Sequence, residues 1–169
     1  FADILCKKTQ PKEGEHFWDI CCGSGCLGIA LKKRFPQLTV SLVDLSVDAL
    51  IQAKKNAENN KVEVEFYQGN LLTPLEGKKA HYVVCNPPYI SHTDFNSLEP
   101  EVKDYEPKLA LLAKENGLEF YQRLARELPN YLYKKGKVFL EIGATQGALV
   151  QELFSRPPWS KPQVEQDWA

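Results

Sequence analysis

The 169-residue sequence lacks several features that would define a class of protein at once. It contains no methionine, even at position 1, so we expect a fragment that begins inside a longer protein. No run of about 18 apolar residues is present, and Asp3 interrupts the short apolar start, which argues against a membrane span and a signal peptide. These absences predict a cytoplasmic protein with no membrane partner.

The number of cysteines and the net charge argue against further kinds of site and partner. The five cysteines are odd in number and contain no Cys-x-x-Cys pair, so we expect neither disulfides nor a metal site. The formal net charge of −1 provides no basic field for a phosphate backbone, so nucleic acid is not an expected partner. We expect a monomer.

Short apolar segments alternate with amphipathic patterns along the chain. We expect strands at residues 17–20, 39–43, 62–67, 80–85, 138–142 and from 164, and helices at residues 27–35, 47–60, 117–133 and 146–154. Ser46 should cap the second helix, and Pro129 should kink or stop the third. An irregular loop is expected from Ile90 to about Glu115. The alternation predicts one α/β domain over residues 1–169, with a mostly parallel sheet covered by helices on both faces.

A glycine-rich turn follows the first expected strand. Gly23-x-Gly25-x-x-Gly28 has the spacing of a dinucleotide-binding turn, and Asp44 ends the next strand about 20 residues further on. An acid in that place can accept hydrogen bonds from ribose hydroxyls. The pattern predicts a bound nucleoside, but NAD and S-adenosylmethionine both carry this ribose, and a tight turn without a ligand can have the same spacing.

The most informative motif is Asn86-Pro87-Pro88-Tyr89, which directly follows the expected strand 80–85, at the edge where open α/β sheets bind ligands. An amide nitrogen is a poor nucleophile because its lone pair is delocalised, so a site must orient the group and accept its N–H hydrogens. The Asn86 side-chain oxygen and the Pro87 carbonyl can accept them, Tyr89 can pack on the flat group, and proline fixes the turn. The motif favours methyl transfer to an amide or amino nitrogen over hydride transfer.

Further motifs accompany this one along the chain. They are Asp19 to Gly25, Asp44-Leu45-Ser46, Asn70-Leu71-Leu72, Tyr105-Glu106-Pro107, Gly117-Leu118, and Glu141-Ile142-Gly143 with Gln146. Together they resemble the release-factor glutamine methyltransferase family over about Ile4 to Asp167. The resemblance implies a Rossmann-like class I S-adenosylmethionine-dependent methyltransferase with strand order 3-2-1-4-5. Its substrate would be the glutamine of the Gly-Gly-Gln loop of peptide-chain release factors. The family's N-terminal helical domain is absent from this sequence, and its last hairpin is incomplete.

The resemblance also implies roles for individual residues. The residues implied to bind S-adenosylmethionine are Asp19, Cys21, Cys22, Gly23, Ser24, Gly25, Asp44, Leu45, Asn70, Leu71 and Asn86. Among them, Cys21 to Gly25 would line the methionine moiety, Asp44 would hold the ribose, and Asn70 with Leu71 would lie at the adenine. The residues implied to be catalytic, because they receive the glutamine amide, are Asn86, Pro87, Pro88 and Tyr89. Glu106, in the long loop, is a candidate for a lid or a substrate contact.

The sequence departs from the family pattern at two places. The family has Gly and Thr where Cys21 and Cys22 stand, and Asp where Asn70 stands. The turn can accommodate Cys21 if its φ stays negative, and Asn70 can still accept from an adenine amine through its oxygen but lacks the charge. We expect changed cofactor affinity without loss of function. Two alternatives stay open: an enzyme that methylates an exocyclic base amine of DNA or ribosomal RNA, and a cofactor-binding fragment without activity.

Overall fold

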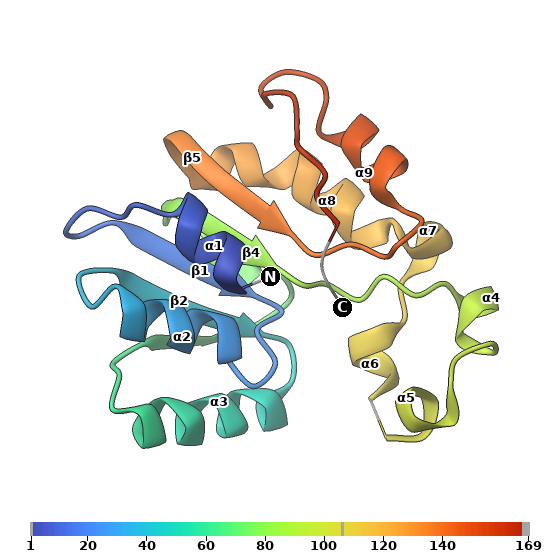
Figure 1. Cartoon of the computed structure of the whole chain (residues 1–169), viewed down its shortest axis with the longest axis horizontal. Coiled ribbons are helices and arrows are strands. Elements are labelled where there is room, and N and C mark those ends of the chain that lie inside the picture. The colour runs from blue at the N-terminus through green and yellow to red at the C-terminus, as the bar shows by residue number, and fades with distance from the viewer. Residues whose placement is uncertain (1, 106, 167–169) are drawn as a thin grey trace. The chain divides into compact units, whose positions relative to one another are not determined.

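The computed structural model describes residues 2–105 and 107–166 (Figure 1). The chain divides into two compact units. The sheet unit comprises residues 1–86 and 130–140, and the helical unit comprises residues 87–129 and 141–169. The prediction of a single catalytic domain over the whole chain stays a prediction.

The sheet unit contains a five-stranded, all-parallel sheet. Its strands are β1 (His16–Ile20), β2 (Thr39–Asp44), β3 (Glu65–Gln68), β4 (Ala80–Cys85) and β5 (Leu132–Leu140). Their order is β3-β2-β1-β4-β5, and every neighbouring pair is parallel. The predicted fold class and strand order are therefore confirmed. Because all strands run the same way, their carboxyl ends lie along one edge, where the candidate residues follow them.

Helices α1 (Ala2–Lys8), α2 (Cys26–Arg34) and α3 (Val47–Asn60) flank this sheet (Figure 1). Helix α2 contacts both α1 and α3 and packs on β1 and β2, which places the three helices in one layer. Leu31 of α2, Leu42 of β2 and Ala53 of α3 are buried in the core between them. A single-turn 3-10 helix, η1 (Thr73–Leu75), follows β3.

Two strand predictions in the sheet unit were wrong at their boundaries. Strand β3 begins at Glu65 and not at Val62, because the Val62 N–H donates to the Ala57 carbonyl and completes the end of α3. Strand β5 begins at Leu132, where a helix was expected, and ends at Leu140. Its pairing with β4 shifts register between Ala80 and Tyr82, and residues 133–135 are all exposed, so no apolar alternation marks the first half of this strand.

The helical unit holds short helices where a long irregular loop was expected. They are α4 (His92–Phe95), α5 (Pro100–Tyr105), α6 (Lys108–Leu111) and α7 (Lys114–Gly117), followed by α8 (Glu119–Glu127) and α9 (Gly147–Leu153). Helix α8 ends at Glu127, and a 3-10 turn, η2 (Leu128–Tyr131), contains Pro129, so the predicted stop is confirmed. Residues 164–166 form no strand, contrary to the prediction, and the rest of that expected strand and Glu106 lie outside the described residues.

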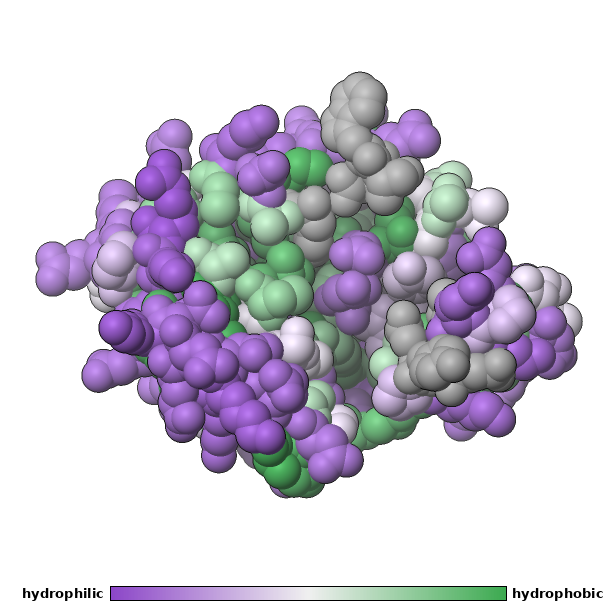
Figure 2. All heavy atoms as spheres, turned by 60° about the horizontal axis from the view of Figure 1, so that its bottom comes forward, coloured by the Kyte–Doolittle hydropathy of each residue, from purple (hydrophilic) through white to green (hydrophobic). Residues whose placement is uncertain are grey.

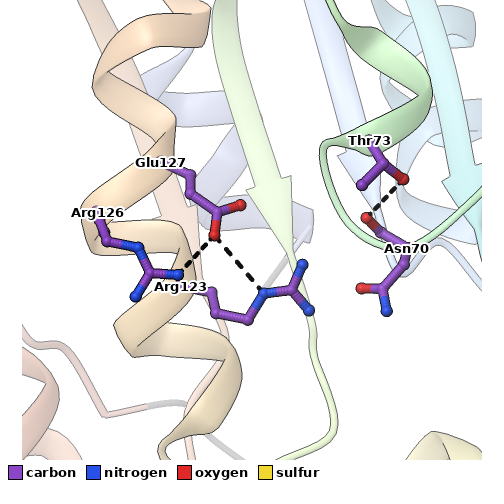
Figure 3. A network of polar contacts seen from close by, with 5 residues as sticks. All are labelled: Asn70, Thr73, Arg123, Arg126 and Glu127. Atoms are coloured by element: carbon purple, nitrogen blue, oxygen red, sulfur yellow. Dashed lines mark hydrogen bonds and ion pairs between the residues drawn. The ribbon is translucent and has the colours of Figure 1, made fainter.

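The surface is mostly polar in the view of Figure 2, with apolar side chains reaching it in smaller areas. On α8, Arg123 and Arg126 pair with the Glu127 carboxylate at 3.7 and 2.8 Å (Figure 3). All five cysteines are free, and within residues 2–105 and 107–166 no group of three or more His, Cys, Asp or Glu side chains could hold a metal ion. Within the same residues, no helix is both long and apolar enough to span a membrane.

Candidate functional site

The glycine-rich turn leaves β1 at Cys21 and enters α2 after Gly25. Its backbone is tied to the neighbouring strand, since the Cys22 N–H donates to the Val43 carbonyl of β2 at 3.0 Å. The turn also closes on itself, with the Gly25 N–H donating to the Cys22 carbonyl at 2.8 Å. This predicted binding loop therefore has a defined conformation at the carboxyl edge of the sheet.

Asp44, at the end of β2, is bonded directly to this turn. Its Oδ2 accepts from the Gly23 N–H at 2.8 Å, and its Oδ1 accepts from the Ser46 N–H at 2.9 Å. A carboxylate has about four lone-pair sites, so each oxygen keeps capacity for a ligand hydroxyl. A Cβ built on Gly23 would meet no heavy atom within 4 Å, which shows open space beside the turn. This acceptor set and this space fit a nucleoside with free ribose hydroxyls.

Asp19 lies inside the sheet unit, only 2% exposed, and braces the start of α2. Its Oδ2 accepts from the Gly28 N–H at 2.8 Å. Burial raises the pKa of Asp19 to about 7, the Gly28 hydrogen bond opposes this rise, and the nearby Asp44 charge adds to it. A Cβ on Gly28 would overlap a methyl group of Leu42 and press on the Asp19 carboxylate, so this close approach requires glycine.

The condition set for Cys21, a negative φ, is not met, because its φ is +57°. The turn after β1 demands the left-handed region, which disfavours side chains that have a Cβ. Parallel pairing sets Ile20 beside Cys85, so the two strand ends bring Cys21 close to Cys85. Burial and the neighbouring Cys21 thiol raise the pKa of Cys85 well above its usual value, and burial likewise raises the pKa of Cys22. Both thiols are therefore neutral, which makes them poor nucleophiles.

The residues predicted to meet an adenine follow β3. The Gly69 N–H donates to the Asp44 backbone carbonyl at 3.0 Å, which sets the segment beside the end of β2. Asn70 is exposed, and its carbonyl accepts from the Thr73 hydroxyl at 3.0 Å (Figure 3). Leu71 is buried at a φ of +53°, whereas Leu45 is 45% exposed. The structure thus brings these residues to the same sheet edge as the glycine turn.

The Asn86-Pro87-Pro88-Tyr89 motif directly follows β4, as predicted. Asn86 belongs to the sheet unit and Pro87 begins the helical unit, so the motif crosses the boundary between them. Asn86 is exposed, and its side-chain amide makes no hydrogen bond within the part of the chain that the structure describes. Pro87 and Pro88 are buried, Tyr89 is half-buried, and the Tyr89 carbonyl accepts from Gln146 Nε2 at 3.0 Å. The roles of these residues stay predictions.

Two supporting side chains were not among the predicted site residues. In the sheet unit, Asn56 of α3 donates to the Ser24 carbonyl at 2.9 Å and so holds the glycine turn. In the helical unit, Gln146 holds Tyr89. A polar residue on a helix, or directly before one, carries no local signal for such a contact. For Gln146 the sequence offered only its place in the Glu141 to Gln146 motif.

Three features define the Rossmann-like methyltransferase fold. They are the strand order β3-β2-β1-β4-β5, a glycine turn after β1 and an acid at the end of β2. The crystal structure of ribosomal protein L11 methylase from Lactobacillus delbrueckii subsp. bulgaricus has this fold too. It matches with a TM-score of 0.66 and 20% identity, over 90% of this chain and 64% of that chain. The family model described as methyltransferase small domain matches residues 2–99, and the chain belongs to that family.

Relatives found by sequence similarity carry a more specific name than the domain family does. The chain is 44% identical over 143 residues to a release factor glutamine methyltransferase of Chlamydia trachomatis, covering 85% of this chain and 49% of the relative. It is 39% identical over 163 residues to the Enterococcus faecalis protein of the same name, covering 96% of this chain and 59% of the relative. The chain therefore spans about half the length of the curated relatives that it matches.

Proposed function

We propose that this chain is the catalytic part of an enzyme that methylates the side-chain amide nitrogen of a glutamine in the Gly-Gly-Gln loop of peptide-chain release factors. The methyl donor is S-adenosylmethionine. The observation that carries the proposal is the Asn86-Pro87-Pro88-Tyr89 motif directly after β4 of this sheet. The names of relatives that are 39% to 45% identical support the choice of acceptor.

The sheet unit supplies the cofactor site in this proposal. Asp44 accepts from the ribose hydroxyls, the turn from Cys21 to Gly25 receives the methionine moiety in the open space beside Gly23, and Asn70 accepts from the adenine amine. The other residues proposed to bind S-adenosylmethionine are Asp19, Leu45, Leu71 and Asn86. When bound, S-adenosylmethionine supplies a methyl group activated by the positive sulfonium, so the protein needs neither a metal nor a nucleophilic side chain.

The motif supplies the acceptor site. The Asn86 side-chain oxygen and the Pro87 carbonyl accept hydrogen bonds from the two N–H groups of the substrate amide, which turns the nitrogen lone pair toward the methyl carbon. As the N–C bond forms, the bond from that carbon to the sulfonium sulfur breaks, and the nitrogen gives up one of its two protons to solvent. Tyr89 packs on the flat amide. Hydrogen bonding from both N–H groups also favours electron density on the nitrogen. The rate gain comes from orientation of the two reactants, which can supply several orders of magnitude in effective concentration.

The proposal has consequences for partners and location. A release factor is the protein substrate, and its role in translation places the enzyme in the cytoplasm. The near-neutral charge, −1 at pH 7, does not provide the basic groove that an enzyme acting on flipped bases would need. We infer a monomer that works without metal and does not take nucleic acid as substrate.

Methyl transfer from labelled S-adenosylmethionine tests the proposal. A release factor, ribosomal RNA and DNA are offered side by side to the protein and to Asn86→Ala. We expect label on the release factor, at the Gly-Gly-Gln glutamine by peptide mass spectrometry. Asn86→Ala should lower kcat/KM by at least about 100-fold, because the amide loses one of its two acceptors.

Other results would redirect the proposal. Label on RNA or DNA would assign the chain to the base-methylating enzymes. Binding of S-adenosylhomocysteine without transfer to any acceptor would identify a cofactor-binding fragment. Glu127→Gln is a suitable control, because Glu127 pairs with Arg123 and Arg126 of its own helix, α8, and the variant should transfer methyl groups like the unaltered protein.

A further inference from the structure

The side chain of Gln146 is buried in the helical unit, 9% exposed, and bonded at both polar atoms. Its Nε2 donates to the Tyr89 carbonyl at 3.0 Å and to the Gly117 carbonyl at 3.4 Å. Its Oε1 accepts from the Gly143 N–H at 3.0 Å. One amide therefore joins three backbone segments: the motif that follows β4, the end of α7 and the loop before α9.

Two glycines bring these segments unusually close. Gly117 has a φ of +84°, and a Cβ there would overlap the Tyr89 carbonyl oxygen and crowd Gln146 Nε2. A Cβ on Gly143 would come within 3.0 Å of Gln146 Oε1 and 3.3 Å of Tyr89 Cδ2. Both the carbonyl and the ring of Tyr89 therefore lie against the cluster that Gln146 organises.

The backbone on either side of this cluster is also held. The Ile90 N–H donates to the Leu111 carbonyl and the Ala113 N–H donates to the Ile90 carbonyl, each at 2.9 Å. The fully buried Tyr121 of α8 donates its hydroxyl to the Glu141 carbonyl at 2.9 Å, which anchors the loop that leads to Gly143. Tyr89 thus has little freedom as long as the Gln146 amide keeps its bonds.

We propose that Gln146 is a positioning residue for the Asn86-Pro87-Pro88-Tyr89 motif. By holding the Tyr89 carbonyl, it fixes the orientation of the Tyr89 ring and of the preceding Pro87 carbonyl, which receive the substrate amide. This inference rests on the proposed function. An amide is suited to the place because it donates and accepts at once, whereas a carboxylate would set a negative oxygen against two carbonyl oxygens.

Gln146→Glu tests the role, with Gln151→Glu as the matched control. Gln151 lies on α9, the helix that begins directly after Gln146. It is half-buried and also donates from Nε2 to a backbone carbonyl, that of Pro162 at 3.0 Å. We expect Gln146→Glu to lower kcat for release-factor methylation about 100-fold, as a misplaced acceptor site does, with unchanged affinity for S-adenosylhomocysteine. Gln151→Glu should stay within about twofold of the unaltered protein.

The pH profile separates positioning from a general loss of stability. A neutral carboxyl can donate to the Tyr89 carbonyl and accept from the Gly143 N–H, but a carboxylate cannot donate. Burial raises the pKa of an introduced carboxyl. At a temperature where all variants are folded, the activity of Gln146→Glu relative to the unaltered protein should therefore rise as pH falls from about 8.5 to about 6. Gln146→Met, which lacks donor and acceptor, should lose the same activity without this recovery.

Hydrogen exchange at the Ile90 N–H provides a readout that does not depend on activity. We expect faster exchange there in Gln146→Glu and Gln146→Met, and none of this change in Gln151→Glu. If the unaltered protein labels a release factor and Gln146→Glu does so equally well, the positioning role is overturned while the proposed function stands. If the unaltered protein labels no release factor, the proposed function falls. Unchanged exchange at Ile90 would then overturn the role of Gln146 as well.

Discussion

At the scale of single residues, Cys21 stands out because it has a side chain where the backbone favours glycine. Its φ of +57° lies in the left-handed region, which costs roughly 1–2 kcal/mol for a residue with a Cβ. Glycine removes that cost but is more flexible in the unfolded chain, so the net gain is smaller. The cysteine is tolerated because the bonds of the neighbouring Cys22 and Gly23 to β2 and to Asp44 hold the turn in place.

Cys21→Gly should therefore stabilise the protein by about 0.5–1 kcal/mol, measured as the free energy of unfolding in urea. Cys21→Ala is the control, since it removes the thiol but keeps the Cβ. It should bring no gain. Equal effects of the two substitutions would show that the thiol, and not the backbone conformation, determines the stability of the turn.

Asp19 is the second residue with an unusual setting. Its pKa of about 7 in the folded protein exceeds the ordinary 3.8, so the folded state binds a proton more tightly than the unfolded state. The tighter proton binding therefore contributes its full amount to the free energy of unfolding below about pH 4, and this contribution is lost as pH rises to about 7.

Asp19→Asn should remove this dependence, because an amide oxygen can still accept from the Gly28 N–H without a charge. The free energy of unfolding of the variant, minus that of the unaltered protein, should grow by on the order of 1 kcal/mol per pH unit between about pH 4 and pH 7. Above about pH 7 the difference should level off. Denaturant titrations across this range measure it, and a constant difference would contradict the buried, protonated carboxyl.

At the scale of elements, α3 couples the end of β2 to the candidate site. Ser46 caps this helix, with its hydroxyl accepting from the Ala49 N–H at 3.2 Å, as the sequence predicted. The same helix carries Asn56, which holds the Ser24 carbonyl of the glycine turn. Loss of the cap should thus destabilise the first turn of α3 and weaken the hydrogen bond from Asn56 to the turn after β1.

Ser46→Ala should cost about 1 kcal/mol of unfolding free energy, because an N–H at the helix start loses its acceptor. Ser46→Asp keeps an acceptor and places a negative charge at the helix N-terminus, so it should retain the stability. Urea denaturation of the three proteins measures the difference. A similar loss in both variants would mean that the hydroxyl acts through some other contact.

At the scale of the whole molecule, the residues of the proposed reaction are shared between two units. The turn, Asp44 and Asn70 belong to the sheet unit, and Pro87 to Tyr89 belong to the helical unit. The peptide bond between Asn86 and Pro87 joins the two sets. Cofactor affinity and the rate of methyl transfer can therefore change independently. Variants of Gln146 should lower the rate of methyl transfer and leave cofactor affinity unchanged.

Much of this arrangement could be predicted from local patterns. The glycine turn, the acid after β2, the cap at Ser46 and the motif after β4 each depend on neighbours in the chain, because burial alternation and turn chemistry act over a few residues. The alternation of strands and helices predicted a parallel sheet, and the strand order followed from the resemblance that these motifs carried. The short helices between His92 and Gly117 were missed, because segments of four to six residues have too few periods to show a pattern.

The sequence by itself determined where β1, β2 and β4 end and which chemical groups follow them. Only the tertiary structure decided how those groups are held. The bond from Gln146 to Tyr89 joins residues 57 positions apart, and the crowding of Gly28 by Leu42 depends on the packing of α2 against β2. Likewise, the positive φ of Cys21 follows from the path between β1 and α2. Local preferences cannot specify such contacts, since they form only when distant segments close on one another.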